Sequence, residues 1–145
     1  MCFHIDPNHP NKLVAESDII CYKAFCGSKD RMLKEKGIIY DDNYFYSIWM
    51  QYQYNKGQLY EVENAFQITF NSFTTRSNEI IETGFHSYID PLEYNLMAWG
   101  IFGGYLVKCI IPVGAEYYIN EKVGEYVSNK IIIGNDDDIV YKYNT

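Results

Sequence analysis

The chain has 145 residues and a formal net charge of −7, with 48% hydrophobic residues against 21% charged ones. This length and composition suit one globular domain over residues 1–145 and exclude a disordered chain. Proteins that bind nucleic acids or anionic membranes attract phosphate groups with clustered Lys and Arg, so the acidic balance excludes both as expected partners.

The first third of the chain contains one predicted strand and one predicted helix. Residues 1–16 predict an irregular lead-in without the basic and apolar regions of a signal peptide, so we expect a cytoplasmic protein. The apolar, β-rich run over 19–25 predicts a strand. Ser28 is a suitable N-cap for a short surface helix over 29–36, which would end at Gly37.

A hairpin and a second helix are predicted in the middle of the chain. Large and polar residues alternate over 49–54, and a turn sequence separates them from a second arm over 58–62. Further on, Asp90 is a good N-cap and Pro91 suits the first helical position, which predicts a helix over 91–99.

The C-terminal part of the chain has mainly strand character. The segments concerned are 105–111, 116–119, 127–133 and 139–143. Together with the earlier elements they predict an α+β domain, in which a mixed, mainly antiparallel sheet is accompanied by two short helices.

Four motifs follow one another along the chain: Asp18-Ile19-Ile20-Cys21-Tyr22-Lys23, Gly84-Phe85-His86-Ser87-Tyr88, Val107-Lys108-Cys109-Ile110-Ile111-Pro112 and Tyr126-Val127-Ser128-Asn129-Lys130. In this order they resemble a family of small uncharacterised proteins from Bacteroides-type bacteria, their phages and mobile elements. The resemblance covers most of the chain and implies a mobile-element origin. It transfers no catalytic assignment.

A second resemblance is to folds of the ADP-ribosyltransferase type. Tyr22 and Lys23 fall on the first strand of that pattern, and Ile111-Pro112-Val113-Gly114-Ala115 falls on a later strand and turn. The loop at Glu125 lacks the Glu-x-Glu of active enzymes, and Lys23 stands where Arg or His is expected. The resemblance therefore implies a shared scaffold or a degenerate site.

Five side chains on or beside predicted strands are candidate ligand-binding residues: Tyr22, Lys23, His86, Tyr118 and Ser128. The Lys23 ammonium could bind an anionic group, and tyrosine rings could stack on a nucleotide-type ligand. Alternation on a sheet with one solvated face explains the same lysine without any ligand. For a binding site, we expect Lys23, His86 and Ser128 to meet in a common hollow.

His86 is the leading candidate for proton-transfer chemistry. Imidazole can act as an acid, a base or a metal ligand near neutral pH. Glu125 is the candidate acid beside it. The alternative is a histidine that only hydrogen-bonds the turn before the predicted second helix.

The cysteines, Cys2, Cys21, Cys26 and Cys109, have no C-x-x-C spacing, and we expect reduced thiols. Cys21, His86 and Cys109 could form a zinc site or a nucleophile–base pair, but a fourth zinc ligand is not evident and core packing also explains both cysteines. Asp136-Asp137-Asp138 lacks the spacing of a calcium loop and indicates a solvated turn. We expect neither a metal nor a cofactor.

These residues do not form a complete catalytic set, and no nucleotide-loop or nucleophile motif occurs in the sequence. The leading hypothesis is a protein that binds a small ligand or a protein partner. An enzyme acting on a nucleotide-type substrate such as NAD is the first alternative. A structural or self-associating protein is the second, suggested by 15 Tyr and 8 Phe.

Overall fold

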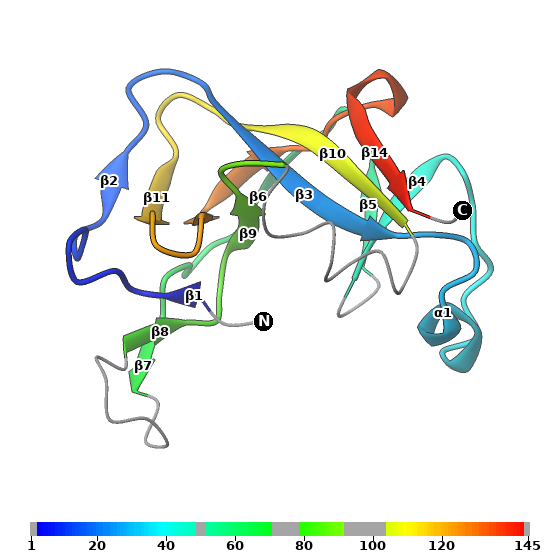
Figure 1. Ribbon diagram of the computed structural model, residues 1–145, viewed down its shortest axis with the longest axis horizontal. Coiled ribbons are helices and arrows are strands. Elements are labelled where there is room, and N and C mark those ends of the chain that lie inside the picture. The colour runs from blue at the N-terminus through cyan, green and yellow to red at the C-terminus, as the bar shows by residue number, and fades with distance from the viewer. Residues whose placement is uncertain (1–2, 49–51, 71–78, 92–103, 144–145) are drawn as a thin grey trace.

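The computed structural model describes residues 3–48, 52–70, 79–91 and 104–143, and strands dominate these ranges (Figure 1). The strands are β1 (Phe3–His4), β2 (Leu13–Val14), β3 (Ile19–Cys26), β4 (Tyr44–Ser47), β5 (Gln53–Asn55), β6 (Leu59–Glu61), β7 (Ile68–Phe70), β8 (Glu79–Ile81), β9 (Phe85–Tyr88), β10 (Gly104–Ile111), β11 (Glu116–Asn120), β12 (Glu125–Ser128), β13 (Lys130–Ile132) and β14 (Ile139–Tyr143). The helical elements are α1 (Arg31–Glu35) and the 3-10 turn η1 (Asp136–Asp138).

The α+β prediction with two helices is wrong, because the described chain is a mainly antiparallel β protein. Its first predicted helix is one short turn, α1, which Asp30 caps in place of Ser28 by accepting a 2.8 Å hydrogen bond from the Met32 N–H. The second predicted helix lies outside the described residues apart from Pro91. None of the helical elements in the described ranges has the length and apolar character of a membrane span.

Eleven strands form one sheet, in which eight follow the order β2-β11-β12-β9-β3-β10-β13-β6. The other three are β14, which pairs with β10, and the β4–β5 hairpin, which joins β3 through β4. Every pairing in this sheet is antiparallel.

Strands β3 and β10 form the centre of the sheet and confirm the strands predicted over 19–25 and 105–111. They pair continuously from Ile19 opposite Ile111 to Phe25 opposite Tyr105. Because side chains alternate along a strand, Cys21, Lys23 and Phe25 share the face that carries the largest hydrophobic cluster. We call this the inner face, and the face that carries Tyr22 and Ala24 the outer face.

A single residue, Asn129, connects β12 to β13, and this connection makes the sheet curl. In the strand order, β9, β3 and β10 lie between β12 and β13, yet the chain passes from one to the other at Asn129. The intervening strands must therefore wrap around the inner face. The continuous strand predicted over 127–133 is accordingly divided at this corner.

The predicted hairpin is also wrong in its pairing. β5 pairs with the preceding strand β4, and β6 pairs with β13. The turn at Gly57 therefore connects two separate parts of the sheet and does not close a hairpin between β5 and β6. Local turn residues indicate that the chain reverses, but they do not select the partner of the strand that follows.

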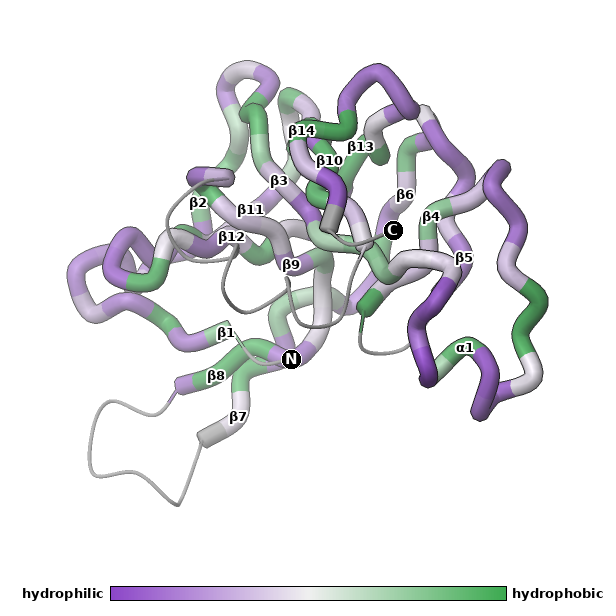
Figure 2. The backbone as a smooth tube through the Cα atoms, turned by 45° about the vertical axis from the view of Figure 1, so that its right-hand side comes forward, coloured by the Kyte–Doolittle hydropathy of each residue, from purple (hydrophilic) through white to green (hydrophobic). Residues whose placement is uncertain are grey.

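A small sheet with the order β1-β8-β7 covers the outer face of β11 and β12. Phe3, Ile5 and Ile81 of this region pack against Tyr118 and Val127. Figure 2 shows the hydrophobic character of β8 and β13 and the hydrophilic turn that contains η1.

Candidate functional site

The five candidate ligand-binding side chains come from neighbouring strands but are divided between the two faces of the sheet. Lys23 and Ser128 lie on the inner face, where Ser128 stands opposite the core residue Phe85. Tyr22 and His86 lie on the outer face, His86 opposite Val127. Lys23, His86 and Ser128 therefore do not direct their side chains into one shared hollow.

Lys23 nevertheless contacts the strand that carries His86. Its ammonium donates a 3.0 Å hydrogen bond to the backbone oxygen of His86 and lies 6.0 Å from the centre of the Tyr54 ring. Burial lowers the pKa of Lys23, although the nearby thiols of Cys109 and Cys21 oppose this effect. The lysine side chain thus supplies a hydrogen bond to β9 in a region where β3 and β9 share only one residue pair, Tyr22 with Tyr88.

His86 is held as a neutral imidazole. Burial and the Lys23 charge lower its pKa from 6.5 to about 4, and its Nε2 lies 3.5 Å from the Glu82 backbone oxygen. Its Nδ1 is buried without a hydrogen-bond partner among the described residues. A second proton would therefore add a buried charge next to a cation, which is unfavourable.

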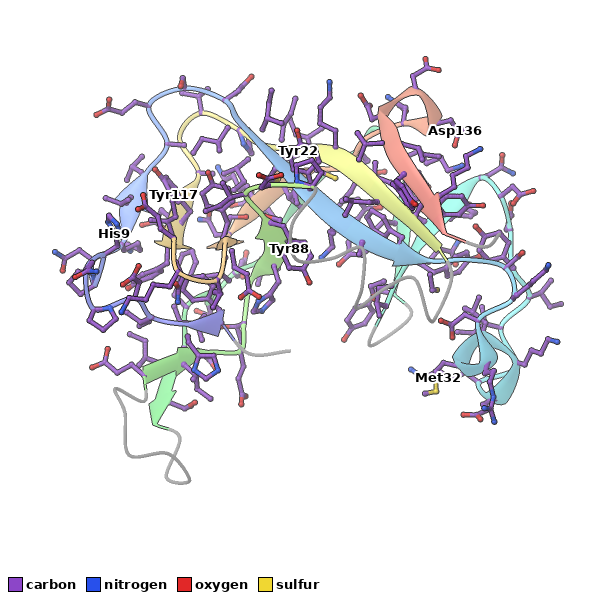
Figure 3. The ribbon with its side chains drawn as sticks, in the orientation of Figure 1. His9, Tyr22, Met32, Tyr88, Tyr117 and Asp136 are labelled. Atoms are coloured by element: carbon purple, nitrogen blue, oxygen red, sulfur yellow. The ribbon has the colours of Figure 1, made fainter. Side chains whose placement is uncertain are left out.

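Glu125 lies on the same outer face as His86. It stands opposite Tyr88, which stands opposite Tyr22, so the three residues form a row across β12, β9 and β3 (Figure 3 labels the two tyrosines). Burial raises the pKa of Glu125. The two candidate proton-transfer residues thus share a face on adjacent strands, offset by two residues in the register.

Tyr118 and Ser128 are surrounded by protein. Tyr118 is 8% exposed beneath the small sheet, with its ring 5.3 Å from that of Phe66. Ser128 is fully buried, and its hydroxyl has no partner among the described residues. Both residues therefore belong to the packed interior around the sheet.

The cysteines and acidic residues do not gather into a metal site within the described ranges. Cys21 and Cys109 are free, directly opposite one another and buried on the inner face, whereas His86 is on the outer face. In η1, Asp136 pairs with Lys56 at 2.6 Å and Asp138 with Lys108 at 3.8 Å. These two aspartates therefore connect η1 to Lys56 and to Lys108 of β10.

A hollow of about 340 Å³ lies elsewhere, between the β4–β5 hairpin and β14. We call it the aromatic pocket; its lining residues are Tyr40, Asp42, Phe45, Lys56, Tyr105, Asp136, Ile139 and Lys142. Its volume lies within the range of small-molecule sites, which are typically about 300–1,000 Å³.

Aromatic rings make the walls of the aromatic pocket rigid. Phe45 stacks on Phe25 of the core at 4.8 Å between ring centres and lies 6.2 Å from Tyr105. Burial raises the pKa of Tyr40, and so do the neighbouring Tyr105 and a hydrogen bond to it. The pocket is therefore anchored to the main hydrophobic cluster rather than formed by surface loops alone.

Of the four charged residues that line the pocket, two form an ion pair with each other and two do not. The Lys56 ammonium lies 4.7 Å from the centre of the Phe45 ring, pairs with Asp136 and donates to the backbone oxygen of Asp42. The carboxylate of Asp42 and the ammonium of Lys142 have no ion pair among the described residues. One unpaired charge of each sign therefore borders the hollow.

The sequence analysis did not find this pocket because its residues come from four separate stretches of the chain: 40–45, 56, 105 and 136–142. Phe45 belongs to the aromatic run that precedes the predicted hairpin, and Tyr105 begins a predicted strand. Tyr105 reaches Lys142 only because β14 pairs with β10. No local spacing encodes that pairing. The aromatic surplus was the single available signal, and it does not specify a location.

Comparisons with protein-family models, with curated proteins and with solved structures give no match to this chain.

Proposed function

We propose that this chain is a small-molecule-binding protein and that the aromatic pocket holds a small zwitterion with an apolar body, such as a free amino acid with a large side chain. The observation that carries the proposal is the combination of aromatic walls with two unpaired charges of opposite sign, Asp42 and Lys142, at one hollow.

The walls favour an apolar body. Tyr105 and Ile139 are partly exposed at the pocket and offer a ring and a branched side chain to any ligand that enters, and the buried Phe45 ring supports this wall beneath Lys56. Aromatic side chains contribute large contact areas and stack with other rings, and they need little reorganisation when they are already packed. Phe45 is 2% exposed, so its ring is already fixed.

The charges favour a ligand that carries both signs. Two carboxylates and two ammonium groups line the pocket, so its formal charge is zero. A purely anionic ligand would meet Asp42 and Asp136, and a purely cationic ligand would meet Lys56 and Lys142. A zwitterion can pair its ammonium with Asp42 and its carboxylate with Lys142, without displacing Asp136 from Lys56.

Isothermal titration calorimetry with L-phenylalanine, phenylacetate and phenethylamine tests this proposal, since the three ligands share a ring and differ in charge. We expect L-phenylalanine to bind at least roughly tenfold more tightly than the other two. Equal affinities, or no heat from any of the three at millimolar concentration, would contradict it.

Matched variants connect the binding to the pocket. Asp42→Asn should weaken L-phenylalanine and phenethylamine but not phenylacetate, and Lys142→Gln should weaken L-phenylalanine and phenylacetate but not phenethylamine. Asp137→Asn is the control, because this exposed neighbour of Asp136 in η1 does not line the pocket. An unchanged affinity in both pocket variants would remove the assignment.

An enzyme acting on a nucleotide-type substrate such as NAD is the second candidate. The observation in its favour is that His86 and Glu125 share the outer face with Tyr22 and Tyr88, while burial keeps the imidazole neutral and raises the carboxyl pKa. Shifted pKa values of this kind are common where protons are transferred.

This second candidate predicts NAD consumption that drops at least roughly a hundredfold in both His86→Ala and Glu125→Gln. Glu121→Gln is a suitable control, because Glu121 lies in the turn beyond β11. A wild-type protein that leaves NAD intact would dispose of this candidate and would leave the aromatic pocket proposal untouched.

A further inference from the structure

Lys23 differs from the other lysines that the structure describes in what surrounds its ammonium. Its side chain points from β3 onto the inner face, between Cys21 and Phe25, both of which are fully buried. The hydrogen bond of its Nζ is to a neutral acceptor, the backbone oxygen of His86. The ring of Tyr54 is its aromatic neighbour.

No carboxylate among the described residues forms an ion pair with Lys23. Lys12, Lys56 and Lys108 each pair with an acidic side chain, whereas Lys142, which has no ion pair among the described residues, is exposed to solvent. A buried ammonium without a counter-charge loses hydration and gains little in return, which favours the neutral amine. The lowered pKa of Lys23 agrees with this environment.

Lys23 is nevertheless not fully enclosed. The Lys23 side chain is half-buried, whereas Cys21 and Cys109 beside it are fully buried. A neutral amine is a nucleophile, and a lysine in apolar surroundings is a common arrangement for attack on carbonyl compounds. Lys23 therefore combines an amine that loses its proton more readily than an ordinary lysine with a side chain that is partly exposed.

We propose that Lys23 is a covalent attachment site for small aldehydes, independent of the ligand proposed for the aromatic pocket. The Nζ lone pair attacks the aldehyde carbon and forms a C–N bond, and the carbonyl electron pair moves to oxygen. Transfer of both amine protons to that oxygen releases one water and leaves an imine. No oxidant, metal or further group is required.

Reductive trapping in the folded wild-type protein tests the proposal. Glyoxylate is the probe, cyanoborohydride supplies the hydride that fixes the imine, and peptide mass spectrometry reads the extent of modification at each lysine at pH 7. Lys108 is the matched internal control, because it lies on the next strand opposite Tyr22, faces the outer side and pairs with Asp138.

We expect Lys23 to be trapped at least roughly tenfold faster than Lys108 in the folded protein, because an amine in apolar surroundings is the better nucleophile toward a carbonyl group. In urea the two rates should become equal. Modification of Lys108 and other exposed lysines while Lys23 stays intact would overturn the proposal. Because both rates come from one wild-type sample, the test does not depend on the folding of a variant.

Discussion

The Lys23 ammonium donates a hydrogen bond to the backbone oxygen of His86, although the two side chains lie on opposite faces of the sheet. The contact bridges β3 and β9 where their ladder is reduced to one residue pair. It also brings a cation close to the imidazole, which helps to keep that ring neutral. Lys23 therefore influences both the pairing of β3 with β9 and the protonation of His86.

His86 should make the protein sensitive to mild acid. The unfolded chain takes up the histidine proton near pH 6.5, but the folded chain takes it up only near pH 4, so stability falls as the pH drops through this window. We expect a loss of about 1–3 kcal/mol that is absent in His86→Gln. Urea unfolding at several pH values measures it, and parallel curves for the two proteins would contradict it.

Gly104 should tolerate no side chain. Its φ is +121°, and a Cβ there would overlap the backbone oxygen of Phe25 on the paired strand. Gly114→Ala is the matched control, because Gly114 also has a positive φ of +85° but has open space around it. Gly114→Ala should cost about 1–2 kcal/mol and Gly104→Ala at least ~2 kcal/mol more, measured by denaturant unfolding. Equal costs for the two substitutions would mean that β3 and β10 leave room for a side chain at position 104.

Asn129 should matter for stability because it fixes the corner between β12 and β13. Its side-chain oxygen accepts a 2.8 Å hydrogen bond from the Glu116 N–H, and its backbone oxygen accepts one of 2.9 Å from the Val62 N–H. Asn129→Ala should cost about 1–3 kcal/mol, because the Glu116 donor loses its partner. Asn8→Ala should be nearly neutral, since the hydrogen bond there uses only the backbone of Asn8.

The buried thiols should resist alkylation. Burial raises the pKa of Cys21 and of Cys26 to about 12 and that of Cys109 to about 11. In a Cys2→Ser variant at pH 8, iodoacetamide should react with these three thiols at least roughly a hundredfold more slowly in the folded protein than in urea. Similar rates in the two states would show that the inner face is open to reagents.

How far the sequence predicts this fold depends on how local each feature is. The apolar runs that became β3 and β10 are evident because their patterns extend over eight residues each. The partner of β6 and the corner at Asn129 depend on contacts across the whole sheet. The Ser28 cap failed for a smaller reason, since Asp30 competes for the same role two residues later.

In the candidate site, too, some residues can be recognised from the sequence, while their arrangement depends on how distant strands pair. Lys23, His86 and Glu125 stand out as polar residues in apolar strands, and two of them share a face. Their distribution over both faces follows from the register of β3 with β9, which the sequence does not specify. Lys142 was overlooked because its importance depends on its place opposite Tyr105.

A crystal structure of the protein grown with L-phenylalanine would show whether the aromatic pocket binds an amino acid. We expect electron density for the ligand among Tyr40, Phe45 and Tyr105, with its ammonium at Asp42 and its carboxylate at Lys142. An empty aromatic pocket in crystals saturated with the ligand, or ligand density only at another place on the protein, would contradict it.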